Sequence, residues 1–155
     1  MNGKIVGGAI VALALITGIA VYYLQVYYFY DRLDGAGEEV ALTLFDGTSE
    51  VIPAESIQAI DASSSPIRYR ACFTTPLSHA MLSETFVIYD EAEPLVAPHW
   101  FDCFDAVEIG RALERGDALA FLGRRNIHPG VDRVVAIDGE GRGYVWHQVN
   151  KEIGE

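Results

Sequence analysis

Acidic side chains are missing from the first 30 positions of this 155-residue chain, and the only basic side chain there is Lys4. All 22 Asp and Glu therefore lie at Asp31 or later, against the other 10 Lys and Arg, so residues 31–155 carry a net charge of about −12. A segment this acidic repels nucleic-acid phosphates, which excludes nucleic acid as a partner. The charge suits a solvated surface or a basic protein partner.

Motifs of catalytic and metal sites are missing too. The chain contains no C-x-x-C, no G-x-S-x-G, no H-E-x-x-H and no phosphate-binding glycine loop. His99, Asp102 and Cys103 are the most tempting metal ligands, but the same stretch holds three large aromatic residues typical of a buried core. We therefore expect no cofactor and no metal, and we keep an enzyme as a minor alternative because catalytic partners can meet in space.

A long apolar run occupies the N-terminal end. Ile5 to Leu24 contains no charge, and its only hydroxyls are those of Thr17 and of the two tyrosines near its end, Tyr22 and Tyr23. At about 1.5 Å per residue it spans roughly 30 Å, the thickness of a hydrocarbon core, where only a helix satisfies its own backbone. The sequence predicts a tail over residues 1–4 and a transmembrane helix over residues 5–30.

Five tyrosines follow the apolar run. A tyrosine ring is apolar in its body and polar at its tip, so it prefers the headgroup layer. We expect a membrane-interface belt, with a stripe that faces a partner as the alternative. Its members are Tyr22, Tyr23, Tyr27, Tyr28 and Tyr30.

The flanking charges predict the orientation. Lys4 and the terminal amine precede the helix, and mainly acidic residues follow it, so the positive-inside rule places residues 1–4 in the cytoplasm and residues 31–155 outside it. Cleavage after Ala20 as a signal peptide is the competing interpretation. We favour an uncleaved anchor because the apolar run is longer than a signal peptide needs, and cleavage would expose an aromatic new terminus.

Small residues are spaced four apart on the predicted helix, as Gly8 with Ala12 and Ala14 with Gly18. Such pairs let two helices approach closely within lipid, so we expect this helix to pack on an integral membrane protein. The alternative is the ordinary abundance of Gly and Ala in such helices.

The rest of the chain reads as a linker over residues 31–38 and an α+β domain over residues 39–155. Short runs with strand character and two helical stretches predict a small, largely antiparallel sheet with about two helices. Residues 131–138 and 143–149 form a hairpin around a glycine-rich turn. The expected strands are 38–47, 50–61, 67–73, 87 onwards, 117–123, 131–138 and 143–149; the expected helices are 76–86 and 105–117.

Local signals are clearest at two places. Asp105 and Glu108 form a D-x-x-E capping pattern, and Gly116 supplies a C-terminal stop. In residues 67–73 the alternation places Arg68 and Arg70 on one face, where we expect ion pairs with the many acids, or else contact with a lipid headgroup.

Two cysteines, Cys72 and Cys103, lie on the side of the membrane that the charges place outside the cytoplasm. An even count in an oxidising compartment favours a disulfide, and buried free thiols are the alternative.

The stretches "RYRACFTTP", "WFDCFDA" and "DGEGRGYVWHQ", together with the N-terminal run, resemble an uncharacterised family of alphaproteobacterial single-pass membrane proteins. The resemblance implies an inner-membrane anchor with a periplasmic domain and no known activity.

We therefore expect a non-enzymatic accessory or assembly subunit of a larger inner-membrane complex, of the respiratory or photosynthetic kind. Membrane lipid surrounds the anchor, and a basic periplasmic protein such as a cytochrome c is a candidate partner of the acidic domain. The alternative is a tethered ligand-binding or sensory domain. Its pocket would be lined by Tyr69, Trp100, Trp146 or His147.

Overall fold

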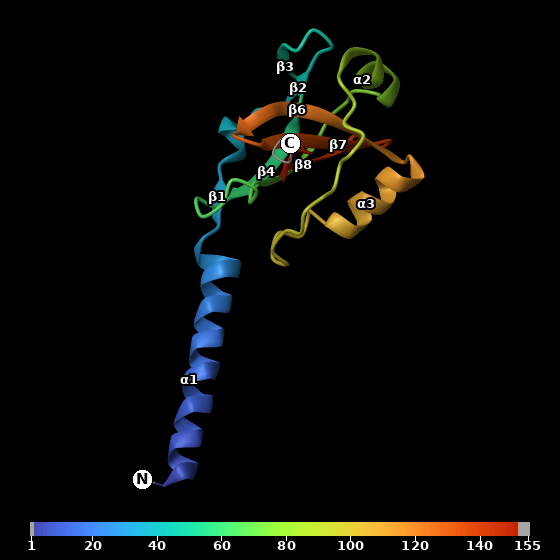
Figure 1. Ribbon diagram of the computed structural model, residues 1–155. Helices are drawn as coiled ribbons and strands as arrows, with labels where there is room; N and C mark the ends of the chain where they lie inside the picture. The colour runs from blue at the N-terminus through green and yellow to red at the C-terminus, as the bar shows by residue number, and fades with distance from the viewer. Residues whose placement is uncertain (1, 152–155) are drawn as a thin grey trace.

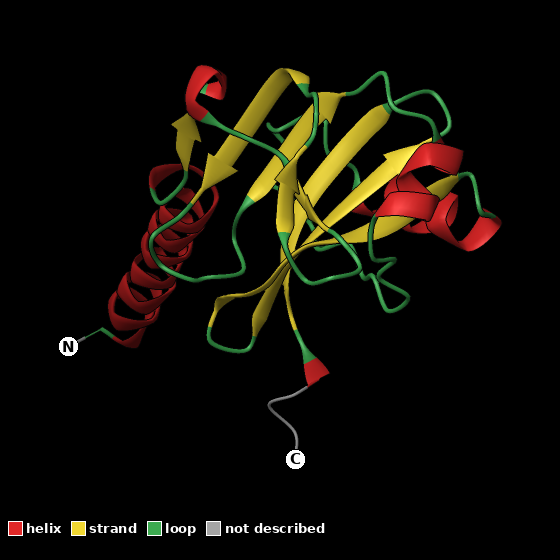
Figure 2. Cartoon of the chain, turned by 90° about the horizontal axis from the view of Figure 1, so that it is seen from above, coloured by secondary structure: helices red, strands yellow, loops and turns green. Residues whose placement is uncertain are grey.

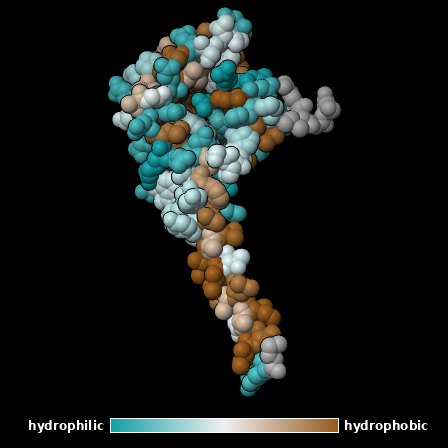
Figure 3. Space-filling view, turned by 90° about the vertical axis from the view of Figure 1, so that its left-hand side faces the viewer, coloured by the Kyte–Doolittle hydropathy of each residue, from teal (hydrophilic) through white to brown (hydrophobic). Residues whose placement is uncertain are grey.

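A helix stands apart from a folded domain in the computed structural model, which describes residues 2–151 (Figure 1). Helix α1 (Gly3–Tyr23) continues into a π-helical turn, Leu24–Tyr28, and no residue of it is buried. Together they are long and apolar enough to cross a membrane, by length and composition. Figure 3 shows this apolar rod leaving a mostly hydrophilic domain. The helix begins at Gly3, so Lys4 lies within its first turn, and the ends of the expected tail and domain, 1 and 152–155, lie outside the described residues.

The domain is built on a six-stranded antiparallel sheet, and the predicted α+β class is confirmed. A separate hairpin, β2 with β3, and two helices complete it. The sheet order is β1 (Asp31–Leu33), β4 (Glu55–Asp61), β5 (Arg70–Thr74), β8 (Arg142–Val149), β7 (Val131–Asp138) and β6 (Ala118–His128); the other elements are β2 (Ala41–Thr43), β3 (Ser49–Val51), α2 (His79–Thr85) and α3 (Ala106–Arg115).

Both faces of the sheet are covered, because side chains alternate along its strands. On β7, Val135 and Ile137 face a core that also takes residues from the β2–β3 hairpin and α2. Val134 and Ala136 face the opposite core, under α3 and the long segment 89–105. Figure 2 shows the helices and loops on either side of the strands. This second core lies beneath the site described below.

The predicted hairpin of β7 and β8 is present, and the geometry of its turn requires a glycine at position 141. The carboxylate of Asp138 accepts from the backbone N–H groups of Glu140 and Arg142. Gly141 has φ +83°, and a Cβ there would lie 2.3 Å from the carbonyl oxygen of Thr75. Only glycine fits this position.

Two segments differ from the prediction. Residues 31–38 are not a free linker, because Asp31–Leu33 pairs with β4 as an edge strand and a 3-10 turn, Gly35–Gly37, follows it. The sequence predicts the stretch from 87 to 98 as a strand followed by an extended segment; the strand is reduced to an isolated bridge of Ile88 to Phe121, and the extended segment follows it.

Candidate functional site at the junction of helix and domain

The last turn of the N-terminal helix is capped by side chains of the domain. The turn is π-helical: the N–H of Phe29 donates to the carbonyl of Leu24 at 3.1 Å. Carbonyls at a helix end lack partners further along the helix. Here Arg68 Nη1 donates to the carbonyl of Gln25 at 3.1 Å, and Trp100 Nε1 donates to that of Val26 at 2.7 Å. The domain therefore holds the helix end by two hydrogen bonds.

Aromatic rings reinforce this junction around Tyr27. Its hydroxyl lies 2.9 Å from His99 Nε2, and its ring stacks on Trp100 at 6.4 Å and on Tyr23 at 5.8 Å. The guanidinium of Arg32 lies 4.8 Å from the centre of the Trp100 ring. Tyr27, a member of the expected belt, therefore contacts both the helix and the domain.

The other belt tyrosines divide in the same way. Tyr22 contacts the Tyr27 ring, and Tyr30 packs edge-on against Trp100 beneath the guanidinium of Arg68. Tyr28 is exposed and packs edge-on against its neighbour Phe29. Their placement at a membrane interface stays a prediction.

A cavity of about 490 Å³ opens at this junction. Its walls come from the helix end (Gln25, Val26 and Tyr30), from residues 65–70 and from residues 95–98. Arg68 and Arg70 are the only charged residues among those lining it.

Arg70 is the unusual member of this wall, since it is 3% exposed. Four of its N–H groups donate to backbone carbonyls, those of Leu95 at 2.9 Å, Ile67 and Tyr69 at 2.7 Å each, and Val96 at 3.1 Å. Among residues 2–151 no carboxylate lies within ion-pair distance of it, so the expected ion pair is not formed.

Burial explains the electrostatics of Arg70. Loss of solvent chiefly, together with the positive charge of Arg68, lowers the pKa of its guanidinium to about 10. Tyr30 and Asp61 oppose this, with Asp61 acting from beyond contact. A guanidinium has five N–H groups, so one of them remains beyond the four that the carbonyls take.

The disulfide holds the outer wall in place. Cys72 and Cys103 are bonded, with their Cα atoms 6.2 Å apart, as the sequence predicts. Cys72 lies on β5 two residues from Arg70, and Cys103 ends the segment that supplies residues 95–98. The bond therefore ties the extended wall segment to the sheet.

The pocket predicted from four aromatic residues does not form. Tyr69 and His147 stack at 4.9 Å on one face of the sheet, Trp146 is fully buried in the opposite core, and Trp100 lies at the junction. The four side chains do not converge.

His147 is held neutral by its surroundings. Its Nδ1 lies 2.9 Å from the carbonyl of Pro66 and Arg133 Nε donates to its Nε2 at 3.0 Å, an arrangement that suits the Nδ1–H tautomer. Burial, chiefly, lowers its pKa to about 4. Burial likewise raises the pKa of Tyr69, whose hydroxyl donates to Glu38 at 2.8 Å.

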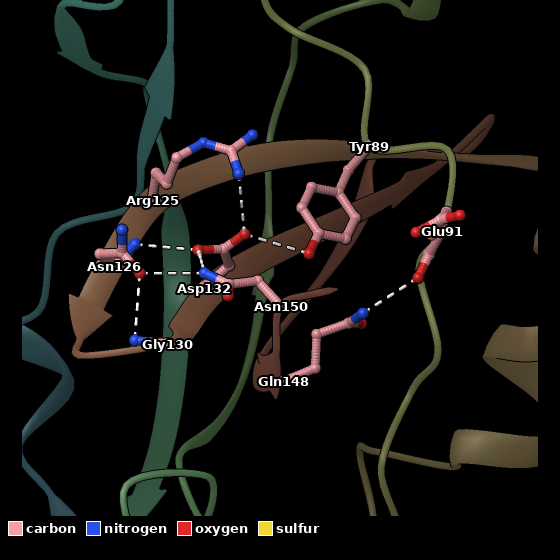
Figure 4. A network of polar contacts seen from close by, with 8 residues as sticks. All are labelled: Tyr89, Glu91, Arg125, Asn126, Gly130, Asp132, Gln148 and Asn150. Atoms are coloured by element: carbon pink, nitrogen blue, oxygen red, sulfur yellow. Dashed lines mark hydrogen bonds and ion pairs between the residues drawn. The ribbon is translucent and has the colours of Figure 1, made fainter. Parts of the chain in front are cut away.

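A second polar network, absent from the sequence predictions, lies where β6 meets β7 (Figure 4). Asp132 is fully buried and accepts from the Asn126 backbone N–H and Asn150 Nδ2, each at 2.9 Å, and from the Tyr89 hydroxyl at 3.1 Å. Burial first, and then the charge of Asp132, raises the pKa of Tyr89 to about 12. Arg125 lies 3.6 Å from the same carboxylate. We interpret this network as structural, because Asp132 holds partners from Asn126, Asn150, Tyr89 and Arg125 together. Among residues 2–151, the side-chain oxygen Oδ1 of Asn150 is buried with no hydrogen-bond partner.

The remaining predicted sites are placed as follows. Cys103 is bonded in the disulfide, so it offers no thiolate, and within residues 2–151 no three His, Cys, Asp or Glu side chains are grouped to hold a metal. Gly8, Ala12, Ala14 and Gly18 lie exposed along α1, and their packing on another helix stays a prediction.

No curated protein and no solved structure matches this chain. Residues 40–155, which hold the whole domain after β1, match one known family. The resemblance to an uncharacterised family is confirmed at that level: the chain belongs to the family of unknown function DUF6446.

Proposed function

We propose that this protein is a non-enzymatic accessory or assembly subunit of a larger bacterial inner-membrane complex, in the alphaproteobacterial single-pass family that the sequence resembles. In this proposal α1 crosses the membrane with its N-terminus in the cytoplasm, and residues 31–155 form a periplasmic domain.

The observation that carries the proposal is the capped junction. Arg68 and Trp100 bond the last carbonyls of the helix, and Tyr27 bonds His99, so the domain does not hang on a loose tether. A fixed junction has a consequence for assembly. Whichever face of α1 packs on a partner helix also sets the direction in which the domain points.

Two further features support a partner in the membrane. The small residues Gly8, Ala12, Ala14 and Gly18 lie exposed along α1, and side chains this small allow another helix to approach closely. The acidic domain would in addition steer a basic soluble protein, such as a cytochrome c, by long-range attraction.

Copurification from mild detergent tests the assembly role. Wild-type protein is expected to bring down one defined set of integral membrane proteins. The Gly8→Leu and Gly18→Leu double variant should lose that set, because leucine holds the helices apart. Ala20→Leu is the control for added bulk elsewhere on the helix: it places a leucine about 120° and about 160° around the helix from the two glycines. Migration of the wild type alone on native gels would contradict the proposal.

The orientation has its own test in intact cells. Alkylation with a large maleimide after acid quenching should shift the protein on a gel only when a reductant is added first, because Cys72 and Cys103 are oxidised outside the cytoplasm. A shift by two thiols without reductant would reverse the topology.

A tethered ligand-binding domain is the second candidate, favoured by the cavity at the junction. Its volume lies within the range of small-molecule sites. Unlike the assembly role, this candidate predicts binding by the isolated full-length protein.

A further inference from the structure

Two groups of cations stand out in the described domain. Arg111, Arg115, Arg142 and Lys151 each contact an acid, and Arg125 contacts Asp132. Arg68 and Arg70, which line the junction cavity, contact backbone carbonyls instead. Among the described residues Arg32, Arg124 and Arg133 have no carboxylate contact either, but only Arg68 and Arg70 gather in one cavity, and in a domain with so large an excess of acids this positive charge requires an explanation.

The cavity combines this charge with an apolar wall. Arg68 uses one N–H for the Gln25 carbonyl, and Arg70 has one N–H beyond its four carbonyl bonds. Ser65 adds a hydroxyl to the same wall. Residues 95–98, Leu-Val-Ala-Pro, face them, and Val96 at the rim is 77% exposed. The donors suit a phosphate, and the apolar wall suits the carbon backbone attached to it.

The position of the cavity identifies the source of such a ligand. Gln25, Val26 and Tyr30 contribute to its wall, and they lie where the apolar stretch of the helix ends. If α1 spans a bilayer, this level is the headgroup layer, where tyrosine rings also gather. A lipid bound there would extend its acyl chains along the exposed surface of α1.

We propose that the junction cavity binds the headgroup of an anionic phospholipid, with the phosphate held by Arg68, Arg70 and Ser65 and the glycerol against residues 95–98. The bound lipid supplies the negative charge that the protein does not place beside Arg70. The site needs the helix in a membrane but no partner protein, so it stands apart from the assembly role.

Native mass spectrometry of the full-length protein tests this proposal. The delipidated protein, in mild detergent, is mixed with equal amounts of phosphatidylglycerol and phosphatidylcholine of the same acyl chains. One phosphatidylglycerol should bind in preference by at least about fivefold, the effect of roughly one arginine facing an anionic headgroup. Equal binding of the two lipids would overturn the proposal.

Two matched pairs of variants locate the site. Arg68→Gln should remove the preference, whereas Arg124→Gln, an exposed arginine on the far edge strand β6, should change it by less than about twofold. Val96→Glu should also remove it, because an acid at the rim repels phosphate and pairs with the arginines. Val107→Glu, at a position 59% exposed on α3, is its control.

The Val96→Glu and Val107→Glu variants are expected to fold, because both side chains are exposed and neither caps the end of the N-terminal helix. An unchanged preference in Val96→Glu overturns the proposal even if Arg68→Gln unfolds. Competition with inorganic phosphate at millimolar concentration is the last experiment. The phosphate should leave the lipid in place; displacement would mark a site for free anions and reject the lipid assignment.

Discussion

The indole Nε1 of Trp100 donates a 2.7 Å hydrogen bond to the carbonyl oxygen of Val26, 74 positions earlier in the chain. A residue of the domain therefore completes the last turn of the N-terminal helix. Because the ring also stacks with Tyr27 and lies 4.8 Å from the Arg32 guanidinium, this one side chain links the helix, strand β1 and the segment 95–103.

Trp100→Phe keeps a ring at this place and removes the donor. The unpaired carbonyl of Val26 should make opening of the junction easier by about 1 kcal/mol. Tryptic cleavage after Arg32, which the closed junction protects, is expected to become roughly fivefold faster where it follows the open population. Timed digestion with mass analysis of the fragments measures it.

Tyr28→Phe is the control for this effect, because Tyr28 is exposed on the same turn and its only ring contact among residues 2–151 is with Phe29. Its cleavage rate should equal that of the wild type. If Trp100→Phe is cut no faster than Tyr28→Phe, the bond to Val26 does not hold the junction.

Removal of the disulfide should cost more. Cys72 and Cys103 enclose a separation of 31 residues, and in the chain-entropy model such a bond stabilises by about 3–4 kcal/mol. The Cys72→Ser and Cys103→Ser double variant should therefore unfold at a clearly lower urea concentration. It should also lose lipid preference, because residues 95–98 are no longer tied to β5. Equal urea midpoints for the variant and the oxidised wild type would contradict this account.

Helix α3 shows what local sequence predicts well. Asp105 accepts from the N–H groups of Val107 and Glu108, and Gly116 adopts the left-handed conformation, φ +75°, at the other end. The second half of the predicted capping box is not formed, since the Glu108 carboxylate pairs with Arg111. The disulfide and the β7–β8 hairpin could be predicted from sequence as well. The cysteine count indicates the first, and the glycine-rich turn between two strand-like runs indicates the second.

The junction could not be predicted, because its contacts join residues far apart in sequence. Tyr27 meets His99 across 72 positions, and nothing local in either stretch indicates the other. Strand β1 has three residues, too few for a periodicity, and it forms because β4 offers an open edge. In the sequence Asp132 is a single polar residue within a strand, with no sign that it is buried. Its burial depends on hydrogen-bond donors from Asn126, Asn150 and Tyr89.

Asp105→Ala tests the cap of α3. Loss of its side-chain acceptor should lower the free energy of unfolding by about 1 kcal/mol. Glu108→Gln removes only a surface pair with Arg111, both partners being 60% exposed, and should change stability by less than about 0.5 kcal/mol. Urea titration measures both variants, and an equal loss in the two would show that the Asp105 cap stabilises α3 no more than the surface pair does.

His147 predicts a pH dependence of stability. Its pKa is about 4 in the folded protein and near 6.5 when unfolded, so the unfolded chain takes up the proton first as pH falls. Neutral His147 therefore contributes about 1–3 kcal/mol to the free energy of unfolding. This contribution is complete above pH 6.5 and is lost progressively as the pH falls to about 4.

Urea unfolding at pH 7 and at pH 4.5 measures this loss. His147→Gln should show a smaller decrease than the wild type. His128→Gln, at the exposed end of β6, removes only a minor cause of the lowered His147 pKa and should therefore keep most of the wild-type decrease. Carboxylates also titrate in this range, so only the comparison between the variants assigns part of the loss of stability to His147. A decrease in His147→Gln as large as in the wild type would remove His147 as its source.

Asp132→Asn tests whether the buried network of Figure 4 holds the β6–β7 end together. The carboxylate accepts three hydrogen bonds in a site with no solvent exposure. An amide of the same shape replaces one acceptor oxygen by a donor. In one orientation this donor faces the N–H groups of Asn126 and Asn150, and in the other it faces Arg125, with only the Tyr89 hydroxyl able to accept from it. We expect a loss of about 2–4 kcal/mol in the free energy of unfolding. Asp102→Asn makes the same chemical change at an exposed position and should stay within about 0.5 kcal/mol of the wild type. Because a network with spare acceptors would absorb the change, equal stability of the two variants would show that Asp132 is dispensable to the fold.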